Sequence, residues 1–179
     1  MRNVYLYLKE YNELIIETLK ASNEQLISYE SNGNVVVFKE RVYEEFDYSS
    51  VIRLLEDDFN NSITLVVGGF NELVIDNISK LPSELYYFDD YLIYLTKKDL
   101  GDKIYKWLSS IDLELLKTIK SFIELDMSVN KTASKLYIHR NTLNYRLDKF
   151  EKLTNINVRT FKGSLSVYLI LNFVQTTNS

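Results

Sequence analysis

The sequence predicts an α+β protein in which a small α/β domain precedes an all-α domain. Between residues 22 and 110, runs of β-branched and aromatic residues alternate with amphipathic stretches of helical period. After residue 111, apolar residues recur only at helical spacing. The charge also divides: residues 1–111 hold 11 basic and 19 acidic residues, whereas residues 112–179 hold 10 and 6. These balances of −8 and +4 indicate two unlike domains, which we place at residues 22–110 and 111–179.

Residues 2–21 have the apolar spacing of one long amphipathic helix, which we treat as a segment of its own (residues 1–21). The positions that recur are Val4, Leu8, Tyr11, Ile15 and Leu19, with charged residues between them. Two alternatives stay open for this helix. It would pair with its twin across a dimer axis, or it would lie on the sheet of its own domain.

The middle of the chain alternates strands and helices. Residues 25–29 and 35–39 would form a hairpin around Ser31-Asn-Gly-Asn34, and residues 47–60 a helix capped near Asp47 or Ser49. Residues 62–68 would form a strand, and residues 71–80 a short helix that Pro82 ends. One or two strands are expected over 85–88 and 91–95. A capping box at Thr96-Lys-Lys-Asp99 would open a helix with Leu100, Ile104, Trp107 and Leu108 inward.

Residues 127–153 have the spacing of a helix-turn-helix, which a supporting helix at 112–126 precedes. A short helix would begin after the cap candidates Ser128 and Asn130, place Ala133 at the helix crossing, and end near Leu136 and Tyr137. A second helix over about 139–152 would turn Leu143, Leu147 and Phe150 toward the first. A last helix at 164–173 is apolar almost all round, so it would either close the domain core or lie in a subunit interface.

The opposite face of the second helix would be free for a partner. It carries Asn141, Asn144, Tyr145, Asp148, Lys149 and Lys152. Arg140 and Thr142 would lie in the first turn, where unpaired backbone N–H groups favour a phosphate. Residues 127–162 contain eight basic and two acidic residues, which is the charge pattern of a surface that binds phosphates.

The helix-turn-helix residues also resemble a known family. The segment from Asn130 to Leu147, followed by Phe150-Glu-Lys-Leu-Thr154, resembles the C-terminal DNA-binding domain of PucR/CdaR-type bacterial transcription regulators, a relative of the Fis-type helix-turn-helix. The most specific pieces are His139-Arg-Asn-Thr-Leu143 and Tyr145-Arg-Leu147. The resemblance covers residues 112 to 174 and implies sequence-specific binding of double-stranded DNA.

Residues 22–110 are similar to the degenerate GGDEF-like domain that precedes this helix-turn-helix in the same family. The similarity rests on Ile63 to Gly69 and on Tyr94 through Asp99-Leu-Gly101. A diguanylate cyclase needs carboxylates at its hairpin to hold Mg²⁺, whereas the corresponding hairpin here, residues 31–34, contains none. We therefore expect no enzyme activity and no cofactor.

Composition excludes further classes of function. The chain has no cysteine, so it has neither disulfides nor a thiolate metal site. Its one histidine, His139, has no potential metal ligand at suitable spacing, and would either cap the second helix or touch a phosphate. No apolar run would span a bilayer and no signal-peptide core is present, so a soluble cytoplasmic protein is expected.

The pattern leads to one main hypothesis, a DNA-binding transcription regulator. Arg140, Asn141 and Asn144 would reach base edges, because Arg suits guanine and Asn suits adenine. Phosphates would be contacted by Thr142, Tyr145, Lys149 and His139, with help from Lys131 and Lys135 of the preceding helix. We expect a homodimer that reads two half-sites about 34 Å apart or a multiple of that distance.

Asp148 does not fit this scheme, because a carboxylate on the outward face repels phosphate. Together with the acidic first domain, it keeps a second hypothesis open: a protein-interaction adaptor whose helix-turn-helix does not bind DNA. A small-molecule sensor with a cleft in residues 22–110 is a third.

Overall fold

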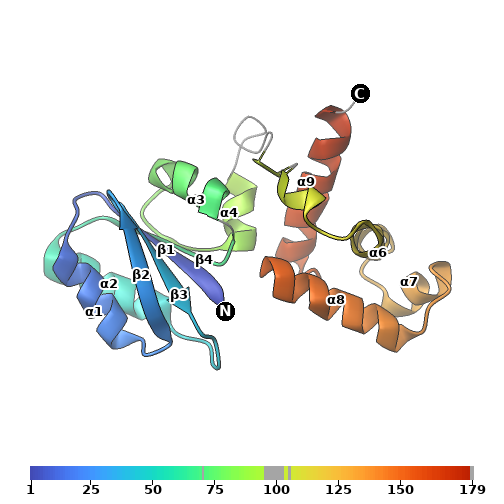
Figure 1. Ribbon diagram of the computed structural model, residues 1–179, viewed down its shortest axis with the longest axis horizontal. Helices are drawn as coiled ribbons and strands as arrows, with labels where there is room; N and C mark the ends of the chain where they lie inside the picture. The colour runs from blue at the N-terminus through green and yellow to red at the C-terminus, as the bar shows by residue number, and fades with distance from the viewer. Residues whose placement is uncertain (70, 95–102, 105, 178–179) are drawn as a thin grey trace. The chain divides into compact units, whose positions relative to one another are not determined.

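The chain forms an α/β unit followed by an all-helical unit (Figure 1). The computed structural model describes residues 1–69, 71–94, 103–104 and 106–177. Two compact units divide these residues, Met1–Tyr91 and Leu92–Ser179. The predicted fold class is therefore confirmed. The second unit begins at Leu92 in the structure. The domain boundary placed at residue 111 stays a prediction.

A five-stranded mixed sheet forms the first unit, with the strand order β2-β3-β1-β4-β5. The strands are β1 (Arg2–Leu8), β2 (Leu26–Asn32), β3 (Val35–Glu40), β4 (Ile63–Val67) and β5 (Leu85–Tyr87). β1 pairs antiparallel with β3 and with β4, and β5 joins β4 in parallel. With α1 (Glu13–Ser22) and α2 (Tyr48–Phe59), the first four strands have the split β-α-β-β-α-β order of a ferredoxin-like unit.

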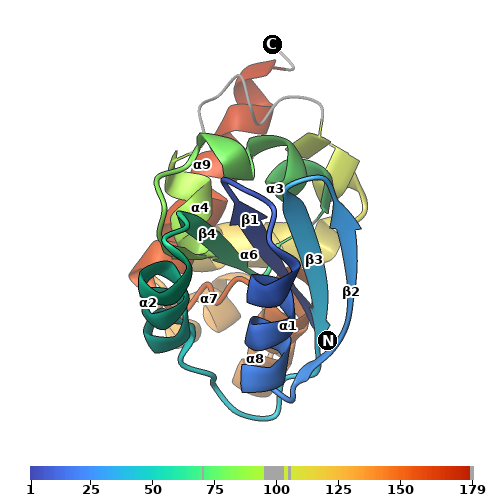
Figure 2. The same ribbon diagram turned by 90° about the vertical axis from the view of Figure 1, so that its left-hand side faces the viewer.

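The core of this unit lies between the sheet and the pair of helices α1 and α2, which cover one face (Figure 2). Ile15, Ile16 and Leu19 of α1 are fully buried there. α3 (Asn71–Asn77), continued by a 3-10 turn at Ile78–Lys80, lies on the other side of the sheet. The sheet is thus covered on both faces, which explains why β1 and β4 are apolar in consecutive positions.

The prediction of one helix over residues 2–21 is wrong. Residues 2–8 form β1, the central strand, and the helix starts only at Glu13, where the Asn12 side chain accepts a hydrogen bond from the backbone N–H of Leu14. Val4 and Leu8 have the spacing of a helix turn, but Tyr5 and Leu6 are buried as well, because both faces of the strand are covered. Of the two alternatives, packing on the domain's own sheet describes α1 correctly. A part for residues 1–21 in dimerisation stays a prediction.

Most other elements of the first unit agree with the sequence. The hairpin around residues 31–34, the Asp47-capped helix and the strand before Gly68 are confirmed. The strand expected at 91–95 is wrong: Phe88–Tyr94 forms the helix α4, with Phe88, Tyr91 and Leu92 buried at helical spacing. Two acidic residues in its first turn, Asp89 and Asp90, favour that helix. The capping box at 96–99 and Leu100 lie outside the described residues, while Ile104 and Leu108 are buried as expected.

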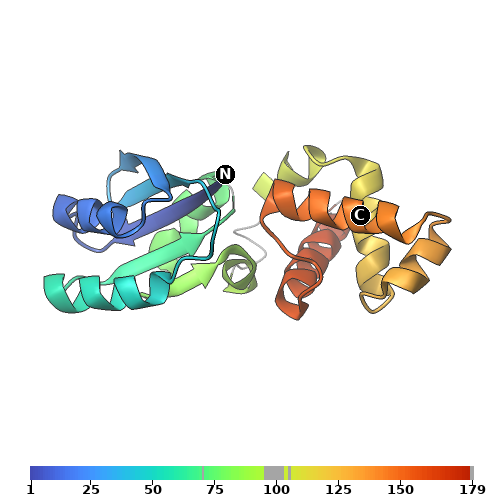
Figure 3. The same cartoon turned by 90° about the horizontal axis from the view of Figure 1, so that it is seen from below.

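Between residues 113 and 177, the second unit consists of four helices: α6 (Leu113–Glu124), α7 (Val129–Lys135), α8 (Arg140–Thr154) and α9 (Phe161–Thr177). Figure 3 shows them from below, with α8 in orange and α9 in red. Ile119, Leu143, Leu147 and Phe150 are completely buried between them. α9 contributes Val167 and Ile170 to the core but leaves Tyr168 and Leu169 about half exposed. It therefore closes the core with one face only.

Candidate nucleic-acid interface

The turn between α7 and α8 is held by backbone and cap hydrogen bonds. Beyond the end of α7, the N–H of Ile138 donates to the carbonyl of Ala133 (3.0 Å) and the N–H of Tyr137 to that of Ser134 (3.2 Å). Tyr137 has a left-handed backbone (φ 52°), as this type of helix end requires. His139 then caps α8, its Nδ1 accepting from the N–H of Asn141 at 3.2 Å. The two helices of the motif are thus joined by a short turn that several backbone and cap hydrogen bonds hold.

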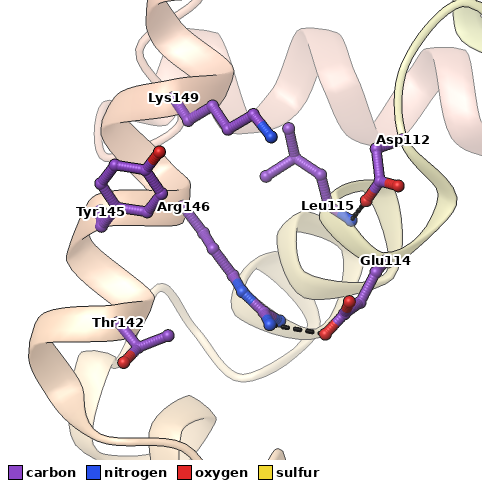
Figure 4. A pocket seen from close by; sticks show the side chains of 7 residues that line it. All are labelled: Asp112, Glu114, Leu115, Thr142, Tyr145, Arg146 and Lys149. Carbon is purple, nitrogen blue, oxygen red and sulfur yellow. Dashed lines mark hydrogen bonds and ion pairs between the residues drawn. The ribbon is translucent and has the colours of Figure 1, made fainter.

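Arg146 ties α8 to the supporting helix α6 (Figure 4). Its Nη1 donates to Thr118 Oγ1 at 2.9 Å, and its Nη2 lies 2.5 Å from Glu114 Oε1. Thr118 is buried, and its hydroxyl in turn donates to the carbonyl of Glu114. Arg146 therefore serves as a strut between two helices, and its guanidinium is bound by groups of α6.

The outward face of α8 is exposed and unengaged. Arg140, Asn141, Thr142, Tyr145 and Lys149 are all exposed. Within the part of the chain that the structure describes, their side chains make no hydrogen bond, ion pair or ring contact, and neither does that of half-buried Asn144. Since Leu143, Leu147 and Phe150 face the core, these six side chains are available to a partner.

The polar residues of this face fall into two rows along the helix. Thr142, Tyr145 and Lys149, at spacings of three and four, line a shallow pocket of about 280 Å³ (Figure 4). The α6 wall of the pocket carries Asp112 and Glu114. Asn141, Asn144 and Asp148 have the same spacings and form the second row. One row thus offers hydroxyl groups and an ammonium, and the other two amides and a carboxylate.

The remaining predicted contacts lie beside this surface. Lys131 and Lys135 are exposed and one helical turn apart on α7, so they share a side of that helix. Lys131 Nζ lies 3.9 Å from Asp126 Oδ2. His139 is exposed while it caps α8. All nine residues predicted as contacts therefore belong to α7, to α8 or to the cap of α8. Their contact with DNA stays a prediction.

Arg159 is a functional candidate that helix periodicity does not reveal, because it lies beyond the end of α8. Its Nη2 lies 2.8 Å from Asp148 Oδ1, and its Nη1 lies 3.7 Å from Glu151 Oε2. The charge of Asp148 is therefore partly offset. In the sequence, the alternation of apolar Ile156 and Val158 with polar neighbours is a signal that Arg159 follows a packed segment, and both apolar residues are buried.

Neither metal binding nor membrane insertion finds support in the described residues. Among them, no cluster of three or more His, Cys, Asp or Glu side chains has an arrangement that would hold a metal ion. No helix in the same residues combines the length and the apolar character needed to cross a bilayer.

Comparison with known proteins places the helical unit in a family. Residues 115–173 match the PucR C-terminal helix-turn-helix domain. The chain is similar to the uncharacterized protein YxkF of Bacillus subtilis (strain 168), with 29% identity over 167 residues. That alignment covers 79% of this chain and 56% of YxkF, so the chain spans about half the length of this relative.

Two further similarities concern regulators. The proline-responsive transcriptional activator PutR of Bacillus subtilis is 36% identical over 58 residues, which is 32% of this chain and 14% of PutR. The crystal structure of a regulator of polyketide synthase expression from Bifidobacterium adolescentis has a similar fold. It superposes with a TM-score of 0.50 at 13% identity, and the match covers 99% of this chain and 81% of that one.

Proposed function

Residues 115–173 form a PucR-type C-terminal helix-turn-helix domain, and from this premise we propose that the chain is a sequence-specific, DNA-binding transcription regulator. The observation that carries the proposal is the outward face of α8. It presents Arg140, Asn141 and Asn144 with no partner among the described residues, next to hydroxyl groups and Lys149.

The two rows have different roles on DNA, and Arg140, one helical turn before Asn144, acts with the second row. Arg140, Asn141 and Asn144 read base edges in the major groove, where Arg pairs with guanine and Asn with adenine. Thr142, Tyr145 and Lys149 bind phosphates of the DNA. His139, Lys131 and Lys135 add contacts to further phosphates of the DNA backbone. Phosphate contacts set the position of the helix, and base contacts select the sequence.

A homodimer is part of the proposal. One helix-turn-helix buries little surface on DNA, and two copies related by a twofold axis would read two half-sites about 34 Å apart or a multiple of that. The exposed Tyr168 and Leu169 of α9 are compatible with such an interface.

The first unit would serve as a non-enzymatic, degenerate GGDEF-like regulatory domain. Its ferredoxin-like strand order and the carboxylate-free hairpin at residues 31–34 support this assignment. Adaptor function is the second candidate, and the −8 balance of residues 1–111 is the observation that favours it, because an acidic surface repels DNA.

Fluorescence anisotropy with the full chain tests the DNA-binding proposal. The double variant Arg140→Ala, Asn141→Ala should reduce the preference for a selected site over scrambled DNA by about tenfold or more. Lys149→Ala should instead weaken binding to all sequences alike and lower the slope of log affinity against log salt by about one.

Lys117→Ala is the matched control, because Lys117 is an exposed lysine of α6 and its replacement removes the same charge. It should leave site preference unchanged. A folded Arg140→Ala, Asn141→Ala variant with full site preference would overturn the base-contact assignment. A chain without salt-dependent DNA affinity that forms a stable complex with another protein would favour the adaptor.

A further inference from the structure

Asp148 is a carboxylate on the outward face of α8 whose position the chain fixes. Its side chain is 56% exposed, and its Oδ1 lies 2.8 Å from Arg159 Nη2. The same nitrogen donates to the backbone carbonyl of Asn144 at 3.3 Å, and Nη1 lies 3.7 Å from Glu151 Oε2. One guanidinium therefore connects three positions on the same edge of the helix.

Arg159 is itself held in place by the segment that follows α8. Ile156 and Val158 on either side of Asn157 are buried to 1% exposure or less. The side chain of Asn157 accepts a hydrogen bond from the backbone N–H of Arg159 at 2.9 Å. The N–H of Ile156 donates to Thr154 Oγ1 at 3.1 Å, which joins the segment to the last turn of α8. The backbone that leads from the end of α8 to Arg159 is thus anchored at several points.

Asp148 lies in the same row of α8 as two residues that are proposed to read bases, so its carboxylate is placed where it could also contact a base. Asn141, Asn144 and Asp148 share an edge of α8, and Asn141 and Asn144 are proposed to read bases. A carboxylate accepts hydrogen bonds only, and the exocyclic amino group of cytosine is the donor that a carboxylate reads in the major groove. Two carboxylate oxygens offer about four acceptor positions, so the contact with Arg159 leaves room for one more donor.

We propose that Asp148 is a specificity-determining residue that accepts a hydrogen bond from a cytosine amino group, and that Arg159 is its positioning residue. This inference rests on the proposed DNA-binding function. Arg159 offsets the repulsion between Asp148 and the phosphates and holds the carboxylate in one orientation before DNA arrives. An ordinary surface ion pair would add little stability and would give no base preference.

The test measures the affinity of the full chain for its selected site and for every single-base variant of that site. Asp148→Asn keeps the shape of the side chain but replaces an acceptor-only group by an amide. It should reduce the cytosine preference at one position of each half-site by about tenfold and shift it toward adenine. Arg159→Gln should weaken the preference at the same position and leave the others unchanged, and Arg159→Lys should restore part of it.

Glu151→Gln is the matched control. It removes one negative charge from α8 and one of the ion-pair partners of Arg159. It should leave every base preference unchanged. Thermal unfolding of each variant establishes that it is folded. If folded Asp148→Asn keeps the base preferences of the wild type at every position, the inference is wrong while the proposed function stands. If the wild type shows no sequence-dependent DNA affinity, both are wrong.

Discussion

His139 stabilises the first turn of α8 as its N-terminal cap. His139 accepts the N–H of Asn141 through Nδ1, so the ring in this role has its proton on Nε2. His139 is exposed, and its Nε2–H is the group that would reach a phosphate oxygen. Capping and phosphate contact, which the sequence left as alternatives, are therefore compatible in one side chain.

Replacing His139 separates the two roles. His139→Ala should lower the free energy of unfolding by about 1 kcal/mol, because the first turn of α8 loses its cap. His139→Asn should keep that stability, since Asn is a good cap residue, and still lose DNA affinity if the ring contacts a phosphate. Urea unfolding of the full chain measures the first effect and anisotropy the second. Equal stability of the wild type and the Ala variant would show that the cap is unimportant.

At this scale the sequence predicted which side chains of α8 face outward, but not what holds them. The apolar stripe of Leu143, Leu147 and Phe150 settles the outward face through helix geometry alone. The partners of Arg146 and Asp148 lie 32 and 11 residues away, on α6 and beyond α8. Such contacts depend on tertiary packing, which periodicity does not describe.

Between elements, two close contacts can be tested by substitution: that of Arg146 with α6 and that of Gly163 with the backbone of Asn157. Arg146→Gln removes the charged contact with Glu114 and should lower the free energy of unfolding of the full chain by about 1 kcal/mol. It should also weaken DNA binding, because α8 loses its tie to α6. Lys120→Gln is the control, since its contact with Glu124 (3.9 Å) lies within α6. An Arg146→Gln variant with unchanged stability and affinity would refute the strut.

Gly163 lies where α9 starts after the turn that carries Arg159. A Cβ atom at this position would be 2.1 Å from the backbone oxygen of Asn157, so Gly163→Ala forces the turn apart. We expect a loss of more than about 2 kcal/mol in the free energy of unfolding. Gly33→Ala is the comparison: its Cβ would meet nothing within 4 Å, and only the left-handed backbone (φ 60°) opposes it. Its cost should stay near 1 kcal/mol, and denaturant unfolding of both variants measures the difference.

The helices with one buried face were predicted well, whereas β1, which is buried on both faces, was not. The half-buried helices α2, α6 and α8 show a clean helical period. β1 is buried on both faces, so Val4, Tyr5, Leu6 and Leu8 form an almost continuous apolar run that also fits a helix. Asn12, the cap of α1, was the local signal that a new element begins after the strand.

For the whole molecule, the division of charge corresponds to a division of structure. The acidic residues dominate the part that contains the sheet, and the basic excess belongs to the part that contains α7 and α8. Association with DNA through the basic part should therefore depend strongly on salt, while the acidic part limits non-specific binding. The sequence indicates this division of charge because net charge is counted from the residues and needs no packing information.

Selection of binding sites from random DNA with the full chain tests the central claim most directly. We predict a recovered motif of two inverted half-sites whose centres are about 10 base pairs, or a multiple of 10, apart. Each half-site should contain the guanine and adenine positions read by Arg140, Asn141 and Asn144. If the selected DNA remains random in sequence although the protein is folded and the salt concentration is low, the claim is contradicted.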